Sequence, residues 1–232
     1  MIEMDFSAEP MRPVELQLHA TKGSSADLAG APNNLRDLLS IGLPQVRPLD
    51  PAEARADDEM RRFLDAEQGR NAYNVILLRC SFNPSGDNRI VEALLQVDLA
   101  VSDDTKPIDP IAWSMDPQKS ERPPLDSENT LKIGGDIKFI KAEYMKTIKS
   151  QSVEVLVEAH NEFCVNPYWK FRETVSKPLT GNFRLGLITQ SPVGIPVAGT
   201  LSLSAKVRRL AMHVFPYKAW LDNFPVRSFA IT

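Results

Sequence analysis

The chain has few of the residues from which metal centres and disulfide frameworks are built. Its 232 residues include two cysteines and three histidines, and His19, His160 and His213 are far apart in the sequence. A zinc site needs several such ligands at short spacing, and a disulfide framework needs several cysteines. We therefore predict no metal and no cofactor. Cys80 and Cys164 lie in strand-like segments and are expected to be buried, reduced thiols.

Long hydrophobic runs and targeting segments are also missing. No stretch approaches the roughly 18 consecutive apolar residues of a membrane span. The first ten residues, M-I-E-M-D-F-S-A-E-P, are acidic and have no apolar core, unlike a secretory signal peptide. We expect a chain without a transmembrane segment, located in the cytoplasm.

Catalytic motifs are not evident either. The sequence has no G-x-S-x-G and no H-E-x-x-H pattern. The glycines at 134–135 and 194 do not open a helix after a strand, which a phosphate-binding loop requires. Acidic pairs such as Asp103-Asp104 are typical of solvated surface charge. No catalytic residue is predicted. A hydrolase-like site assembled from loop acids and His160 or His213 remains the alternative.

Strand patterns dominate the middle of the chain. Residues 89–101 read R-I-V-E-A-L-L-Q-V-D-L-A-V, with apolar residues at every odd position from Val91 to Val101. Successive side chains of a strand point to opposite faces, so this pattern predicts a strand with one buried face. Residues 73–82 form a second strand pattern, and N-P-S-G-D-N at 83–88 is a turn cluster. Together they predict a hairpin at the centre of a sheet.

Several shorter segments repeat the strand pattern, each bounded by proline, glycine or other turn residues. They are residues 14–20, 153–157, 168–175, 182–190 and 200–207. Many short strands separated by turn signals indicate two packed antiparallel sheets. The predicted fold is therefore mainly β, an antiparallel β-sandwich of immunoglobulin-like or jelly-roll-like type over residues 71–210. Residues 137–149 fit either a helix or a strand.

Residues 1–70 are predicted to form an acidic extension with a short strand and one or two short surface helices. Leucines at 35–43 suggest a short helical turn. A longer helix is expected near 51–67, because Asp50 can cap it and Pro51 suits the first helical position.

Charge is unevenly distributed along the chain. Residues 1–130 carry 13 Lys and Arg against 23 Asp and Glu, whereas residues 131–232 carry 14 against 7. Opposed charges favour self-association or an intramolecular attraction. The basic half offers only Lys206, Arg208 and Arg209 as a tight group, so nucleic-acid binding is not clearly indicated. A membrane-surface role is also disfavoured.

Two features suggest contact with a protein partner. The first is Trp113 in a proline-rich segment, 102–129, that we expect to be a long loop. The second is the C-terminal tail, residues 211–232, whose aromatics include Trp220, Phe224 and Phe229. Aromatic residues dominate interface hot spots. These features predict a non-enzymatic binding or assembly module that contacts a protein partner, or a second copy of itself, through these four residues.

Overall fold

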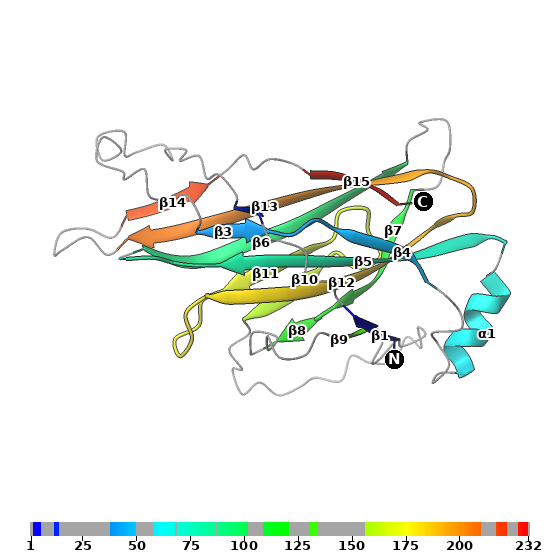
Figure 1. The fold of residues 1–232 in the computed structure, drawn as a ribbon, viewed down its shortest axis with the longest axis horizontal. Coiled ribbons are helices and arrows are strands. Elements are labelled where there is room, and N and C mark those ends of the chain that lie inside the picture. Colours follow the sequence, from blue (N-terminus) through cyan, green and yellow to red (C-terminus); the bar gives the residue numbers. More distant parts are fainter. Residues whose placement is uncertain are drawn as a thin grey trace.

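The computed structural model describes the backbone of most of the chain. The described residues are 2–5, 12–13, 38–49, 58–67, 69–86, 88–101, 109–120, 130–133, 156–209, 217–221 and 227–231. They form two antiparallel sheets packed face to face (Figure 1), which confirms the predicted β-sandwich. The segments 14–20 and 137–149, for which strands or a helix were considered, lie outside the described residues.

The first sheet, which we call sheet I, contains seven described strands around a long central pair. Its order is β14 (Tyr217–Leu221), β13 (Val197–Arg209), β6 (Asn88–Val101), β11 (Tyr168–Arg172), β10 (Val157–His160) and β8 (Lys119–Ser120), and β15 (Arg227–Ile231) also pairs with β13. The C-terminal tail thus contributes two strands to the edge of β13.

The second sheet, sheet II, is built around another long pair. Its order is β2 (Arg12–Pro13), β3 (Leu39–Ile41), β5 (Asn71–Phe82), β12 (Gly181–Pro192) and β7 (Ile111–Asp116), and β4 (Gln45–Pro48) also pairs with β5. Two more strands, β1 (Ile2–Asp5) and β9 (Thr130–Ile133), pair separately with each other.

A cluster of aromatic side chains joins the two sheets. Phe171 of sheet I contacts Phe82 and Phe183 of sheet II, with ring centroids 5.0 and 5.1 Å apart and edge-to-face geometry. Phe82 and Phe183 also contact each other. Beside them Trp169 is fully buried, and its indole N–H donates to the Pro117 carbonyl at 3.2 Å. Edge-to-face packing is the favourable arrangement for aromatic pairs, so this cluster holds the two sheets together near the end of β5 and the start of β12.

Strand β5 is buried on both faces, which explains its unbroken apolar sequence. One face enters the sandwich core. The other carries Tyr73, Val75 and Leu77, which pack against Leu64 of helix α1 (Asp58–Glu67). The predicted surface helix near 51–67 is present over 58–67, and its Phe63 and Leu64 pack against the outer face of sheet II. Residues 51–57 lie outside the described part of the chain.

The predicted hairpin of residues 73–82 and 89–101 is wrong. Strand β5 pairs with β12, β3 and β4, whereas β6 pairs with β13 and β11, so the 83–88 turn crosses from one sheet to the other. Local turn residues specify that the chain reverses, but they do not specify whether the two strands hydrogen-bond or face each other across the core.

The alternation predicted for β6 holds from Ala93 to Leu99 and fails at its start. A β-bulge at Val91 shifts the register there, so Val207 lies opposite Ile90 and Lys206 opposite Glu92. Ile90 is consequently in the core with 1% of its surface exposed, and Val91 is only half-buried. A bulge adds one residue and inverts the parity of the side chains that precede it.

Two other local predictions are corrected by strand pairing. Leu38 and Leu39 are fully buried, and residues 39–41 form β3 rather than a helical turn, because they pair with the end of β5. The segment 102–129 is not one long loop, because residues 111–116 form β7 against β12 and 119–120 form β8 against β10.

Replacing Phe171 by alanine should destabilise the fold by about 3–5 kcal/mol, since a fully buried ring between both sheets is lost. Phe163→Ala is the matched control, because that ring is 49% exposed and its loss should cost about 1 kcal/mol. Urea unfolding followed by circular dichroism measures both. Equal costs for the two variants would contradict the central role assigned to the aromatic cluster.

Candidate functional site

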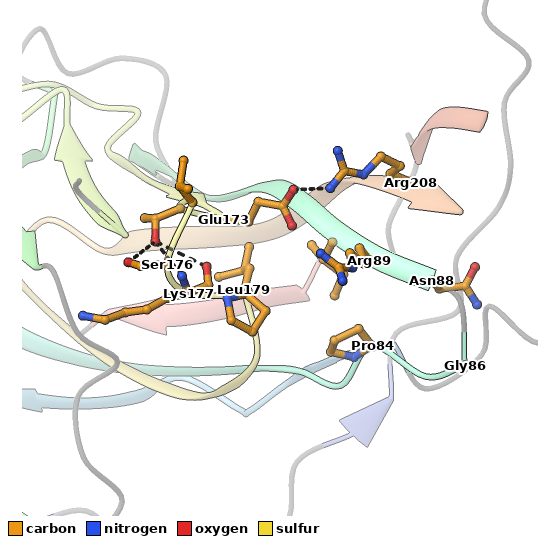
Figure 2. Close-up of a pocket in the computed structure, with 13 residues that line it drawn as sticks. Pro84, Gly86, Asn88, Arg89, Glu173, Ser176, Lys177, Leu179 and Arg208 are labelled. Atoms are coloured by element: carbon orange, nitrogen blue, oxygen red, sulfur yellow. Dashed lines mark hydrogen bonds and ion pairs between the residues drawn. The ribbon is translucent and has the colours of Figure 1, made fainter. Parts of the chain in front are cut away.

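A polar cleft of about 440 Å³ opens at one end of the sandwich (Figure 2). Its walls are two of the connections that cross between the sheets, the β5–β6 turn with Pro84 and Gly86 and the β11–β12 loop from Glu173 to Leu179. The start of β6 and the end of β13 form its floor. The cleft is therefore a consequence of the sandwich topology, because both crossovers lie at the same end.

The charged groups of the cleft are mainly cationic. Its described lining contains Arg89, Lys177 and Arg208 and a single carboxylate, Glu173. Nη2 of Arg208 donates to Oε1 of Glu173 at 2.7 Å. Arg89 is exposed and forms no ion pair with a described residue. Figure 2 shows Arg89 between the Arg208–Glu173 pair and Pro84.

Strand register places the two arginines side by side. Arg208 of β13 lies directly opposite Arg89 of β6, so both side chains leave the same face of sheet I. Lys218 of β14 lies opposite Arg208 on the other side. The sequence marks Arg208 as part of a basic group, but no local pattern marks Arg89 or Glu173, because their proximity depends on the pairing of β6, β11 and β13.

The β11–β12 loop is held in shape by its own hydrogen bonds. The backbone N–H of Thr174 donates to the Lys177 carbonyl at 2.9 Å, and the Lys177 N–H donates to the Thr174 hydroxyl at 3.0 Å. The Glu173 N–H donates to the carbonyl of the bulged Val91 at 3.0 Å. The bulge in β6 therefore anchors the loop that supplies the cleft's only described carboxylate.

Trp113 is packed in an aromatic group on the outer face of sheet II. Its ring stacks on Phe63 of α1 at 5.5 Å and meets Tyr73 edge-on at 5.2 Å. A bulge in β7 at Trp113 turns it outward while Ala112 and Met115 stay in the core. Trp113 is half-buried, so part of its ring is accessible to a partner.

The Tyr73 hydroxyl in this group is buried without a hydrogen-bond partner among the described residues. Burial, together with the nearby Glu67 carboxylate, raises the pKa of Tyr73 to about 12, so the phenol stays neutral at physiological pH.

The two described strands of the C-terminal tail lie along the edge of β13 (Figure 1). Strand β14 pairs with residues 205–209 and β15 with residues 197–201. Phe229 of β15 is partly buried against the core and lies over Gly199. A Cβ at Gly199 would stand 2.7 Å from one ring carbon of Phe229 and closer to two others, so the glycine makes room for the ring.

The predicted partner-binding residues do not come together. Trp113 belongs to sheet II, whereas Trp220 and Phe229 lie at opposite ends of the β13 edge of sheet I, where Trp220 is opposite Lys206. Phe224 falls outside the described residues. The C-terminal residues and Trp113 are thus two separate surfaces.

His160 is one of the two histidines considered for a hydrolase-like site. Its ring stacks on Tyr168 with centroids 4.8 Å apart, and Nε2 lies 3.5 Å from Glu158 without forming a hydrogen bond. Glu158 is held by Lys119 at 2.9 Å, and this contact lowers the Glu158 pKa. His213 lies outside the described residues. Among the described residues no hydrogen bond joins His160 to a serine or cysteine.

The two cysteines differ in exposure. Both are free, but Cys80 is buried and Cys164 is exposed in the turn after β10, so the prediction of two buried thiols is wrong for Cys164. Burial raises the pKa of Cys80 far above its ordinary value. The strand that contains Cys164 in the sequence prediction ends at His160, where Asn161 and Phe163 adopt positive φ angles.

The described residues include no group of three or more His, Cys, Asp or Glu placed to hold a metal ion. In that same part of the chain, no helix has the length and apolarity needed to cross a membrane.

Comparisons with known proteins identify no family. No protein-family model and no curated protein matches the sequence. Among solved structures, the chain is similar to Clostridium perfringens delta-toxin, with 9% identity, a TM-score of 0.26, and coverage of 70% of this chain and 78% of the toxin. A pore-forming protein gives 8% identity, a TM-score of 0.27, and coverage of 83% and 90%. TM-scores this low do not establish a shared fold, so neither resemblance bears on the proposals below.

We expect the free energy of unfolding to depend on pH through the carboxyl group of Asp116. Burial raises its pKa from 3.8 to about 6, so the folded chain holds this proton more tightly than the unfolded chain. The stability that this difference contributes is present below about pH 4 and is lost as pH rises to about 6. Asp116→Asn should therefore gain stability over the wild type at pH 7 but not at pH 4, as measured by urea unfolding at both values.

The control for this experiment is Asp65→Asn on the exposed face of α1. If Asp116→Asn changed stability equally at the two pH values, burial of the charged carboxylate would not be the cause.

Gly199→Ala should weaken docking of the tail, because the added methyl group collides with the Phe229 ring. The expected cost is about 1–3 kcal/mol, typical of overpacking. In a Phe229→Ala background most of this cost should disappear, because the colliding ring is absent. Unfolding measurements on both single variants and the double variant form a complete thermodynamic cycle, and strictly additive costs would contradict the contact.

Proposed function

We propose that the chain is a non-enzymatic binding or assembly module that contacts a protein partner through its C-terminal tail and the edge of β13 beneath it. The main support for this proposal is the pairing of the tail with the edge of β13. Two five-residue strands, β14 and β15, pair with opposite ends of one edge strand. Between them, residues 202–204 of β13 have no described strand on that edge.

The edge of a sheet is a template for another strand, because it presents a row of backbone N–H and C=O groups. Partners that add a strand to such an edge gain main-chain hydrogen bonds, and side chains at alternate positions provide specificity. Here the tail occupies the template in the folded chain. A partner strand, or the tail of a second copy, would make the same hydrogen bonds.

Short strands near a chain end are suited to this exchange. Each tail strand makes only a few ladder hydrogen bonds, and local opening of such terminal elements costs less than unfolding of the whole domain. Two side chains anchor β15 in the part of the structure that is described: Ile231, which is buried in the core, and Phe229, whose ring lies over Gly199. Exchange of identical elements between copies is a low-cost route to dimers. We therefore expect the second copy to be the first partner to detect.

A disulfide between β13 and β15 tests the proposal on the full chain. Ala198 and Ala230 lie opposite each other in register, at a spacing that a disulfide can bridge. In a Cys164→Ser background, Ala198→Cys with Ala230→Cys should lock the tail when oxidised. Sedimentation should show dimers of the reduced chain at rising concentration and monomers of the oxidised chain, with dimers restored by reductant.

The matched control is a disulfide that joins two central strands and leaves the tail free. Ser202 and Gln96 lie opposite each other on β13 and β6, and cysteines at these two positions should leave association unchanged. The proposal fails if oxidation of the tail pair does not prevent association. It also fails if the reduced chain stays monomeric and does not bind a synthetic peptide of residues 216–232.

A further inference from the structure

The cleft at the crossover end carries more positive than negative charge in its described lining. Its one carboxylate, Glu173, is already paired with Arg208 at 2.7 Å. Arg89 lies opposite Arg208 in strand register and has no acidic partner among the described residues. Like charges directly opposite each other on neighbouring strands destabilise a sheet, so an anion between the arginines would relieve this repulsion.

Arg208 also has an unused hydrogen-bond donor. Its Nε atom is buried and has no hydrogen-bond partner among the described residues. Buried polar groups are nearly always hydrogen-bonded, so an orphaned donor in a cleft needs an explanation. Arginine presents its N–H groups as a planar fork that matches carboxylate and phosphate oxygens. With Nη2 on Glu173, Arg208 still offers donors to a second oxyanion.

Hydrogen bonds fix the wall of the cleft that the β11–β12 loop forms. The Thr174–Lys177 hydrogen bonds close the loop on one side, and the Glu173 N–H is fixed to Val91. Preorganised donors bind more tightly, because less conformational freedom is lost on binding. The volume of about 440 Å³ falls in the range of small-molecule sites.

We propose that this cleft binds a small dianionic ligand, a phosphate ester or a dicarboxylate, between Arg89 and Arg208. Glu173 has two effects in the site. It holds Arg208 in position, and its own charge limits the affinity for anions. The site borders the β13 edge, because Arg208 lies opposite Lys218 of β14, but neither arginine takes part in the pairing of β15.

Isothermal titration of the full chain tests the proposal, with inorganic phosphate, pyrophosphate and malonate as probes at constant ionic strength set with chloride. We expect saturable binding of at least one probe. A preference for pyrophosphate over malonate would indicate a phosphate ester as the ligand class, and the reverse preference would indicate a dicarboxylate.

Three substitutions then separate a site from general charge attraction. Arg89→Gln should weaken binding about 10- to 100-fold, as expected for loss of a charge-assisted hydrogen-bond pair. Glu173→Gln should strengthen binding several-fold, because a repelling charge is removed while an oxygen acceptor for Arg208 remains. Arg62→Gln, on the exposed surface of α1, should leave binding unchanged.

The proposal is wrong if none of the three probes binds saturably. It is also wrong if Arg62→Gln weakens binding as much as Arg89→Gln, since binding would then follow net charge. Circular dichroism and melting temperature of each variant establish that a lost affinity does not come from lost folding. Retained phosphate binding by Arg89→Gln in a folded chain would equally overturn the assignment.

Discussion

Burial of one face of each sheet against the other is the constraint on which the rest of this structure depends. The aromatic group of Phe82, Phe171 and Phe183 spans the two layers, and Trp169 fills the space beside it. Because large rings dominate the energy of a core, the packing of these rings restricts how the strands that carry them can lie across the core. The crossovers, edges and clefts then follow from how the chain connects those strands.

Backbone N–H and C=O groups along one edge of each sheet are covered by other parts of the chain. On sheet II, the turn after β10 covers the edge of β7 that does not pair with β12, and there the Phe163 N–H donates to the Ala112 carbonyl at 2.7 Å. On sheet I, the C-terminal tail covers the edge of β13 with two short strands. A tail that shields an edge in this way also controls access to it, which links the stability of the fold to the proposed assembly.

Two β-bulges determine where Trp113 and Glu173 lie. The bulge at Trp113 sends an indole to the outer face of sheet II without removing Ala112 from the core. The bulge at Val91 keeps Ile90 in the core and provides the carbonyl that holds Glu173. Bulges commonly re-aim side chains in this manner. In both cases the extra residue allows the neighbouring core side chain to stay buried while another group faces the surface.

Much of the strand content could be predicted from local sequence, because side-chain alternation is a property of each strand alone. Residues 93–99 show this directly, since their alternating exposure follows their alternating hydrophobicity. The candidate site could not be predicted in the same way. Arg89, Glu173 and Arg208 are separated by 84 and 35 positions along the chain, and nothing in their local segments marks them as neighbours.

The sequence by itself determined the mainly β class, the strands at the centre of each sheet and the presence of one helix before them. The periodicity of hydrophobic side chains carries this information, and periodicity acts over a few residues. Only the tertiary structure decided that β5 and β6 lie in different sheets, that residues 39–41 form a strand, and that two arginines line one cleft. These outcomes depend on which strands pair and in which register, and pairing is settled by burial across the whole core.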